Sequence, residues 1–189
     1  MRTLFTIHAG EFLVGERIEK KFRELNVWVP SKDTGLDLLI TDSSNRRAVS
    51  LQVKFSRDYL ATHMEEAFQR KLRACGWWTL SRKKIAESKA DYWVFVLLGF
   101  AHQSADFVIV KPKELLRRLD SIHDRPEKIH SYLWVTKDKR CWETRDLRLK
   151  EKEEIADGRY VDKIRDFTEY LNQWKPIQAM SSRPAAPAS

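Results

Sequence analysis

The sequence predicts an α/β (α+β) domain in which a central mixed β-sheet is flanked by helices. Three observations lead to this fold class: an amphipathic helical segment near the start, several short apolar segments of strand length, and helical segments between and after them. This mixture is typical of a sheet covered by helices. With 189 residues, the chain is long enough for one domain with a substantial core.

The composition supports a packed globular protein. Hydrophobic residues make up 42% of the chain, including seven Trp and nine Phe, which is too apolar for a disordered chain. We expect one domain over residues 1–174, with its core at about 9–110 and helical and strand additions at 111–174. Residues 175–189 have the composition of a flexible tail.

The same composition predicts a cytoplasmic protein without a membrane segment. The longest apolar run, residues 92–100, is far too short to span a bilayer. The N-terminus reaches a carboxylate before a signal-peptide core could form. Cys75 and Cys141 lack the spacing of a metal site, and we expect reduced thiols, with a disulfide between them as the alternative.

The net charge favours a polyanionic partner. Lys and Arg outnumber Asp and Glu by 35 to 27, which gives a formal charge of +8. Positive charge steers phosphate-bearing partners towards a protein. Charge alone is weak evidence, because many basic proteins bind no nucleic acid.

The first 56 residues are typical of a helix followed by three strands. Apolar residues recur at helical spacing over residues 10–25, at Val14, Ile18, Phe22 and Leu25. Strands are predicted at residues 26–30, 36–42 and 48–56. Because only a short turn separates the last two, we expect them to form a hairpin.

The remaining segments alternate between helical and strand patterns. Helices are predicted at residues 60–75, where Gly76 ends the helix, at 82–88, and at 111–119, with Pro112 in the first turn. Strands are predicted at 91–100, covered on both faces, at 105–110, and as a pair at 131–136 and 139–144. A last helix is predicted at 159–174, with a stripe of Val161, Ile164, Phe167 and Leu171.

Four polar residues stand out against this pattern. Gln52 and Lys54 are two apart in an alternating strand, so both side chains leave the same face. Asp37 interrupts an apolar strand, where a carboxylate needs a partner. Glu11 lies along the apolar stripe of the first helix and so points towards the sheet, whereas Glu16 should face solvent.

Each residue also has a structural explanation that needs no function. Gln52 and Lys54 could be the solvated side of a half-buried strand. Asp37 could cap the preceding turn. Glu11 could compensate the dipole of the first helix.

Taken together, the three pieces AGEF, GLDLLI and LQVKFS resemble the active-site motifs of the PD-(D/E)XK nuclease superfamily. The resemblance covers residues 9–56 and is closest to the Q-x-K branch of intron-encoded homing endonucleases, which is similar to archaeal Holliday-junction resolvases. It implies a restriction-endonuclease-like fold. Leu36 stands where the family often has Pro, and Gln52 stands at the acidic position, where an amide offers an oxygen but no charge.

The resemblance implies a magnesium-dependent endonuclease acting on DNA, with manganese expected to substitute. Asp37 would be the main metal ligand, beside the Gln52 oxygen and the backbone carbonyl of Val53. Glu11 would bind through water or help to place a second ion. Lys54 would orient the attacking water and stabilise the charge that develops on phosphorus.

Contacts with the DNA backbone are expected from three basic clusters, although each could be an ordinary solvated helix face. These clusters comprise Arg17, Lys20 and Lys21; Arg70, Lys71 and Arg73; and Arg82, Lys83 and Lys84.

Trp77 and Trp78 could stack on bases, with burial in a core or interface as the favoured alternative. His8 is expected to be structural or at the surface, with contact to the scissile phosphate as the alternative. Double-strand cleavage would need two sites, so we expect a homodimer or higher oligomer.

Two other classes of function stay open. A nucleic-acid-binding module that kept the fold and lost catalysis is favoured by Gln52. A protein-interaction subunit of a defence or toxin system would use the aromatic second half of the chain for its contacts.

Overall fold

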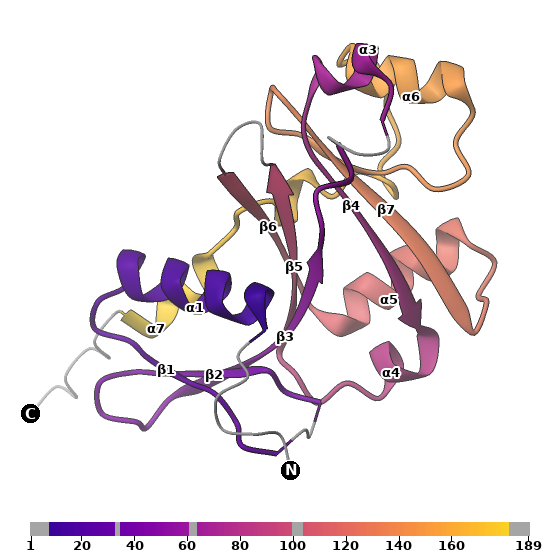
Figure 1. Cartoon of the computed structure of the whole chain (residues 1–189). Coiled ribbons are helices and arrows are strands. Elements are labelled where there is room, and N and C mark those ends of the chain that lie inside the picture. Colours follow the sequence, from indigo (N-terminus) through magenta and orange to yellow (C-terminus); the bar gives the residue numbers. More distant parts are fainter. Residues whose placement is uncertain (1–7, 33–34, 61–63, 100–103, 182–189) are drawn as a thin grey trace, which may run out of the picture.

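The computed structural model describes residues 8–32, 35–60, 64–99 and 104–181, which form two β-sheets with helices around them (Figure 1). The first sheet has the strand order β1-β2-β3-β5-β6, with bounds Asn26–Trp28, Leu38–Thr41, Ala48–Ser56, Tyr92–Gly99 and Ser104–Val110. The second has the order β4-β7-β8, with bounds Leu72–Ser81, Lys128–Thr136 and Cys141–Glu143. The helices are α1 (Ala9–Lys21), α3 (Glu66–Gln69), α4 (Arg82–Ala86), α5 (Pro112–Ile122), α6 (Leu149–Ala156) and α7 (Lys175–Ser181).

Strand β3 lies at the centre of the first sheet and makes it a mixed sheet. It pairs antiparallel with β2, in the predicted hairpin, and parallel with β5. The predicted α+β fold with a central mixed sheet is confirmed, and the second sheet is an addition that the sequence pattern did not separate from it. Strands β5 to β8 and helices α4 and α5 form at the predicted places, within a few residues.

Alternation along β5 divides the interior into two cores. Val94 and Val96 face α1 and α7. Phe95 and Leu97 face the second sheet together with α4 and α5. All four are 1% exposed or less, which confirms that this strand is covered on both faces. A third, smaller core lies beneath α3 and α6.

Helix α1 is shorter than the pattern of apolar residues. It ends at Lys21 because Phe22 leaves helical geometry, although Phe22 and Leu25 remain buried in the core with Val14 and Ile18. The chain must reverse direction before β1 begins at Asn26, and this turn uses the residues predicted as the last helical turn.

The predicted helix at 60–75 is wrong over most of its length. Among the described residues of this segment, Leu60 and the single turn α3 are α-helical, and β4 begins at Leu72; residues 61–63 lie outside the described part. Gly76 is therefore a strand residue rather than a helix terminus. Its missing side chain makes room for Trp78, because a Cβ at Gly76 would lie 2.3 Å from Cη2 of that indole.

Substituting Gly76 with alanine should therefore destabilise the fold. Gly76→Ala is expected to lower the free energy of unfolding by about 1–3 kcal/mol, because the Trp78 ring must move within a packed core. Gly15→Ala is the matched control: its Cβ would meet Val27 at an ordinary 3.5 Å inside α1, and we expect a gain of about 0.5–1 kcal/mol. Urea unfolding of both variants measures the difference, and equal stabilities would contradict this packing.

The last predicted helix, at 159–174, is also wrong. This segment is mostly irregular and contains one 3₁₀ turn, Thr168–Tyr170, and Val161 of the expected apolar stripe is 84% exposed. Conversely, the expected tail forms helix α7 at Lys175–Ser181, whose Ile177 and Met180 pack into the core beside α1. The rest of the predicted tail, 182–189, lies outside the described residues.

Two smaller expectations concern thiols and membranes. Cys75 and Cys141 are both buried and not bridged to each other, as expected. Burial raises the pKa of the Cys75 thiol to about 12 and that of Cys141 well above its usual value, so neither is a reactive thiolate. Among the helices of the described ranges, none combines the length and apolarity needed to cross a membrane.

Candidate active site

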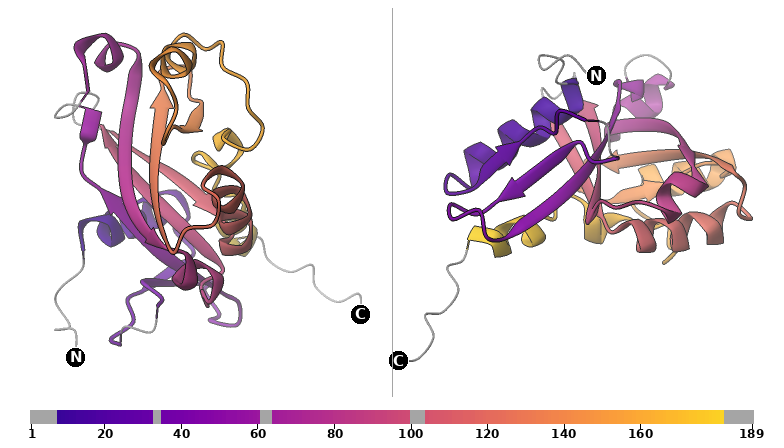
Figure 2. Two further views of the ribbon diagram at one scale, coloured as in Figure 1. Left: turned by 90° about the vertical axis from the view of Figure 1, so that its right-hand side faces the viewer. Right: turned by 90° about the horizontal axis from the view of Figure 1, so that it is seen from below.

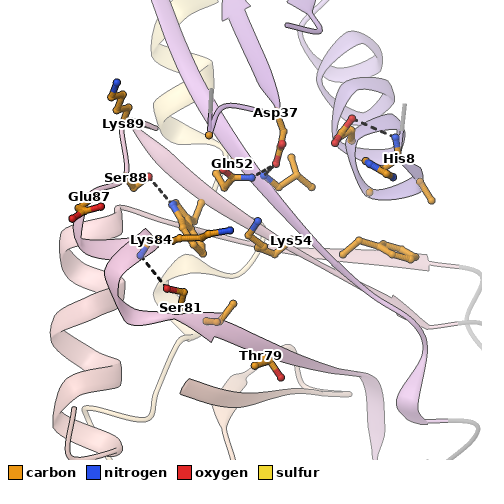
Figure 3. A pocket seen from close by; sticks show the side chains of 18 of the residues that line it. His8, Asp37, Gln52, Lys54, Thr79, Ser81, Lys84, Glu87, Ser88 and Lys89 are labelled. Carbon is orange, nitrogen blue, oxygen red and sulfur yellow. Dashed lines mark hydrogen bonds between the residues drawn. The ribbon is translucent and has the colours of Figure 1, made fainter. Parts of the chain in front are cut away.

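The four candidate residues line one groove of about 1120 Å³ (Figure 3). Its wall combines the N-terminus of α1, the turn before β2, the middle of β3, the end of β4 and the segment from α4 to β5. Glu11, Asp37, Gln52 and Lys54 contribute from three of these elements, together with the backbone region of Val53. The groove is thus built from segments that are distant in the sequence.

Asp37 lies one residue before β2, at the point where β2 and β3 separate. The backbone N–H of Asp37 makes the last hydrogen bond of this pairing, to the Leu51 carbonyl at 2.8 Å. The next N–H of β3 on this side, that of Val53, is beyond the end of β2 and donates to Asp37 Oδ2 at 2.7 Å. The carboxylate therefore replaces a missing strand partner, and it is only 5% exposed.

The side chain of Gln52 also donates to Asp37 Oδ2, through Nε2. One carboxylate oxygen thus receives two N–H donors from adjacent residues of β3. The hairpin register pairs Leu38 with Leu51, so Asp37 and Gln52, each next to one of these residues, lie side by side. The short connection between β2 and β3, visible in the sequence, is what allows this contact.

Glu11 reaches the groove from the first turn of α1. Its Oε2 accepts a hydrogen bond from the His8 backbone N–H at 3.3 Å, and the residue is 4% exposed. Gly10 lets the helix approach β3 closely, because a Cβ at that position would lie 2.7 Å from Cβ of Phe55. Glu11 therefore lies in the first turn of α1, where its charge suits the helix dipole, and it also caps the helix and lines the groove. His8 is a wall residue on the other side of β3 from Lys54 (Figure 3).

Gln52 and Lys54 leave the same face of β3, as the alternation predicted (Figure 3). This face looks towards the second sheet, since Gln52 is paired with Trp93 and Lys54 with Phe95. The Lys54 ammonium lies 5.2 Å from the centre of the Trp93 ring, in reach of a cation–π interaction. The indole N–H of Trp93 is held by Ser88 Oγ at 2.9 Å, so the ring under Lys54 is fixed.

Of the nine basic residues proposed to contact DNA, only Lys84 lines this groove. Most of the others form ion pairs elsewhere, namely Lys20–Glu16, Arg70–Glu66, Lys71–Asp157, Arg73–Asp106, Arg82–Asp120 and Lys83–Glu87. Arg17 and Lys21 instead lie over the rings of Phe107 and Phe22. Those eight predictions therefore gain no support from the groove.

Two basic residues of the groove, Arg57 and Lys89, were not singled out from the sequence. Arg57 directly follows β3, and Lys89 lies just before β5, which is the parallel neighbour of β3. Because β3 and β5 run parallel, the end of β3 and the start of β5 lie at opposite ends of the pair. No local pattern in the sequence therefore marked both residues as part of one groove.

The groove offers a limited set of oxygen ligands for a cation. Among the described residues, no cluster of three or more His, Cys, Asp or Glu side chains could hold a metal ion. Asp37 and the Gln52 amide are in direct contact, and turning that amide by 180° would present its oxygen instead of its nitrogen without moving the chain. With that rotation, one carboxylate and one amide oxygen would suit a hard cation that keeps several waters.

Comparison with known proteins adds no identification. The chain matches no protein-family model, no curated protein and no solved structure.

Proposed function

We propose that this groove is the active site of a magnesium-dependent endonuclease that hydrolyses phosphodiester bonds of DNA. The observation that carries the proposal is that Glu11, Asp37, Gln52 and Lys54 all line one groove although they come from three separate elements. The resemblance of their sequence motifs to the PD-(D/E)XK superfamily supports the same activity. Manganese would serve in place of magnesium.

The charges around the groove suit a phosphate held beside a cation. Its walls carry four basic side chains, Lys54, Arg57, Lys84 and Lys89, and three carboxylates, Glu11, Asp37 and Glu87. The basic groups attract and position a phosphate backbone. The carboxylates of Glu11 and Asp37, from α1 and the turn before β2, favour a divalent ion over a purely phosphate-binding role.

The chemistry divides between the proposed ion and the side chains. A bound magnesium ion would polarise the scissile phosphate and make its bound water more acidic. Asp37, the Gln52 oxygen and the Val53 carbonyl would hold it, with Glu11 acting through water. Lys54 would orient the attacking water and stabilise negative charge on the phosphate, while the Trp93 ring holds its ammonium in place.

Two further properties follow from this activity. Cutting both strands of a duplex needs two active sites, so we propose a homodimer or higher symmetric oligomer. A cytoplasmic location is proposed because both cysteines are unbridged, which fits a reducing compartment.

Lys54→Met is expected to lower cleavage of supercoiled plasmid by roughly 100-fold, because it removes one charge aimed at the transition state. Methionine keeps an apolar stem against Trp93, so the fold should persist. Lys150→Met, on the exposed surface of α6 and outside the groove, is the matched control and should leave the rate unchanged. Equal rates for the Lys54 variant and the unmodified chain would remove Lys54 from the mechanism.

A second candidate is a nucleic-acid-binding module without catalysis. It is favoured by the hydrogen bond that Gln52 Nε2 donates to Asp37, because this orientation holds the amide oxygen away from the carboxylate. Such a module would bind DNA with a steep salt dependence. Calorimetric titration with magnesium separates the two candidates. The nuclease should bind magnesium and lose this binding in an Asp37 variant, whereas the binding module should bind no magnesium at this site.

A further inference from the structure

The second sheet carries a row of aromatic rings on the face that points away from the core shared with Phe95 and Leu97. Trp77 on β4 is paired with Tyr132 on β7, and the next pair on this face is Thr79 with His130. The Trp77 and His130 rings are parallel within 3°, with centroids 6.1 Å apart. Tyr59 meets Trp77 edge-on at 5.9 Å, and Tyr132 lies at 6.0 Å. We call Tyr59, Trp77, His130 and Tyr132 the aromatic row.

The aromatic row is accessible from solvent, unlike the aromatic residues of the cores. His130 and Thr79 are exposed, and Trp77, Tyr132 and Tyr59 are half-buried. The neighbouring Trp78 faces the opposite side of β4 and is 6% exposed in the core between the sheets. Helices α3 and α6 lie towards one end of β4 and β7 and leave the rest of these strands open (Figure 2). Half-buried rings on an open sheet face offer flat apolar area to a ligand.

This row continues directly from the groove. Thr79 and Ser81 of β4 line the groove (Figure 3). Thr79 Oγ1 lies 3.1 Å from Nδ1 of His130. Trp77 is one further step along the same face, about 7 Å by strand geometry. From the other side, Ser56 of β3 accepts a hydrogen bond from the Trp77 backbone N–H at 3.0 Å, and Ser56 is two residues beyond Lys54.

Basic residues border the row along its length. Arg57 is exposed and lines the same groove as Lys54. At the other end, the Arg145 guanidinium lies 5.5 Å from the centre of the Tyr132 ring, and Lys152 lines a second pocket of about 380 Å³ with Tyr59 and Tyr132. Rings flanked by cations are the combination that binds unpaired nucleotides, since bases stack on the rings while the cations follow the phosphates.

We infer that the aromatic row binds an unpaired stretch of the nucleic-acid substrate, whose bases stack on Trp77, His130 and Tyr132 while the adjoining phosphate enters the groove. The inference rests on the proposed function for the groove and adds the class of substrate: nucleic acid with a single-stranded segment, such as a flap, gap or branch. Duplex DNA exposes no base faces to these rings, so the binding of a duplex should depend on the aromatic row much less than the binding of a single strand.

The test is binding without cleavage, in EDTA, measured by fluorescence anisotropy. The probes are a labelled oligothymidine, an oligouridine of equal length, and a duplex of equal length. Trp77→Ala and His130→Ala are expected to weaken oligothymidine binding by about 5- to 100-fold and to change duplex binding by less than about twofold. His130 is exposed, so its variant should fold even if Trp77→Ala is destabilised. Trp28→Ala, at a 50% exposed Trp on β1, is the matched control and should bind as the unmodified chain does.

Each outcome decides a different point. Equal losses for duplex and single strand, or no loss in the folded His130 variant, would overturn the stacking role even if plasmid cleavage remains. Selective loss of single-strand binding in a protein that never cleaves would support the row and reject the proposed nuclease activity. A larger loss for oligouridine than for oligothymidine would assign the row to RNA rather than DNA.

Discussion

Asp37→Asn is expected to reduce magnesium-dependent cleavage of plasmid DNA by on the order of 1000-fold. The substitution removes the charge that would hold the metal, an effect worth several kcal/mol in the transition state, and each 1.36 kcal/mol is a factor of ten in rate. The amide oxygen of asparagine can still accept the Val53 N–H that Asp37 Oδ2 accepts at 2.7 Å. The end of the β2–β3 pairing should therefore survive, so a loss of activity would report on charge rather than on folding.

Two glutamates of α1 provide a matched comparison for this result. Glu11 lines the groove, whereas Glu16 pairs with Lys20 on the outer surface of the same helix. Glu11→Gln is expected to lower the rate by roughly tenfold, as for a group acting through a metal-bound water, and Glu16→Gln should have no effect. Cleavage that persists unchanged in both Asp37→Asn and Glu11→Gln would place the activity outside this groove or in a contaminating nuclease.

Arg118→Met is expected to lower the free energy of unfolding by about 3–5 kcal/mol. Arg118 lies on α5 and is 6% exposed, and its Nη1 donates to three backbone carbonyls of the irregular segment, at Lys163, Ile164 and Asp166, over 2.8–3.0 Å. Its guanidinium also lies over the rings of Phe167 and Tyr170. Methionine would fill much of the volume but leave these carbonyls without their donor, which is costly in a buried setting.

The neighbouring Arg117 separates this effect from a simple loss of charge. Both arginines contact Glu114, and hydrogen bonds from Arg117, Arg118 and Tyr170 together lower the pKa of that carboxyl to about 2. The Arg117 side chain is 54% exposed, so Arg117→Ala should change stability by less than about 1 kcal/mol. Urea unfolding compares the two variants, and equal effects would mean that Arg118 does not hold the irregular segment.

Local patterns predicted the hairpin and the first helix because both depend on short-range periodicity. The alternation from Val49 to Ser56 determined which side chains share a face, and the short turn determined that β2 and β3 pair. These two facts were enough to bring Asp37 next to Gln52 and Lys54. The stripe of α1 likewise directed Glu11 towards the sheet.

Helical patterns led to wrong predictions where contacts with distant segments determine the local conformation. Residues 72–75 were compatible with a helix, but pairing of β4 with β7 makes them a strand, and Trp78 fills the space above Gly76. The segment 159–174 has helical spacing, yet Arg118 binds three of its carbonyls and so takes acceptors that a helix would need for its own hydrogen bonds.

By itself, then, the sequence determined the order of the elements around the groove and the faces on which the four polar residues lie, because strand and helix periods act within a few residues. Only the tertiary structure decided which basic residues reach the groove. Arg73 and Arg82 pair with Asp106 and Asp120 instead, whereas Arg57 and Lys89 line the groove from opposite ends of the parallel β3–β5 pair. Ion pairing and strand order depend on residues far apart in the sequence, so neither produces a periodic pattern of residue types along the chain.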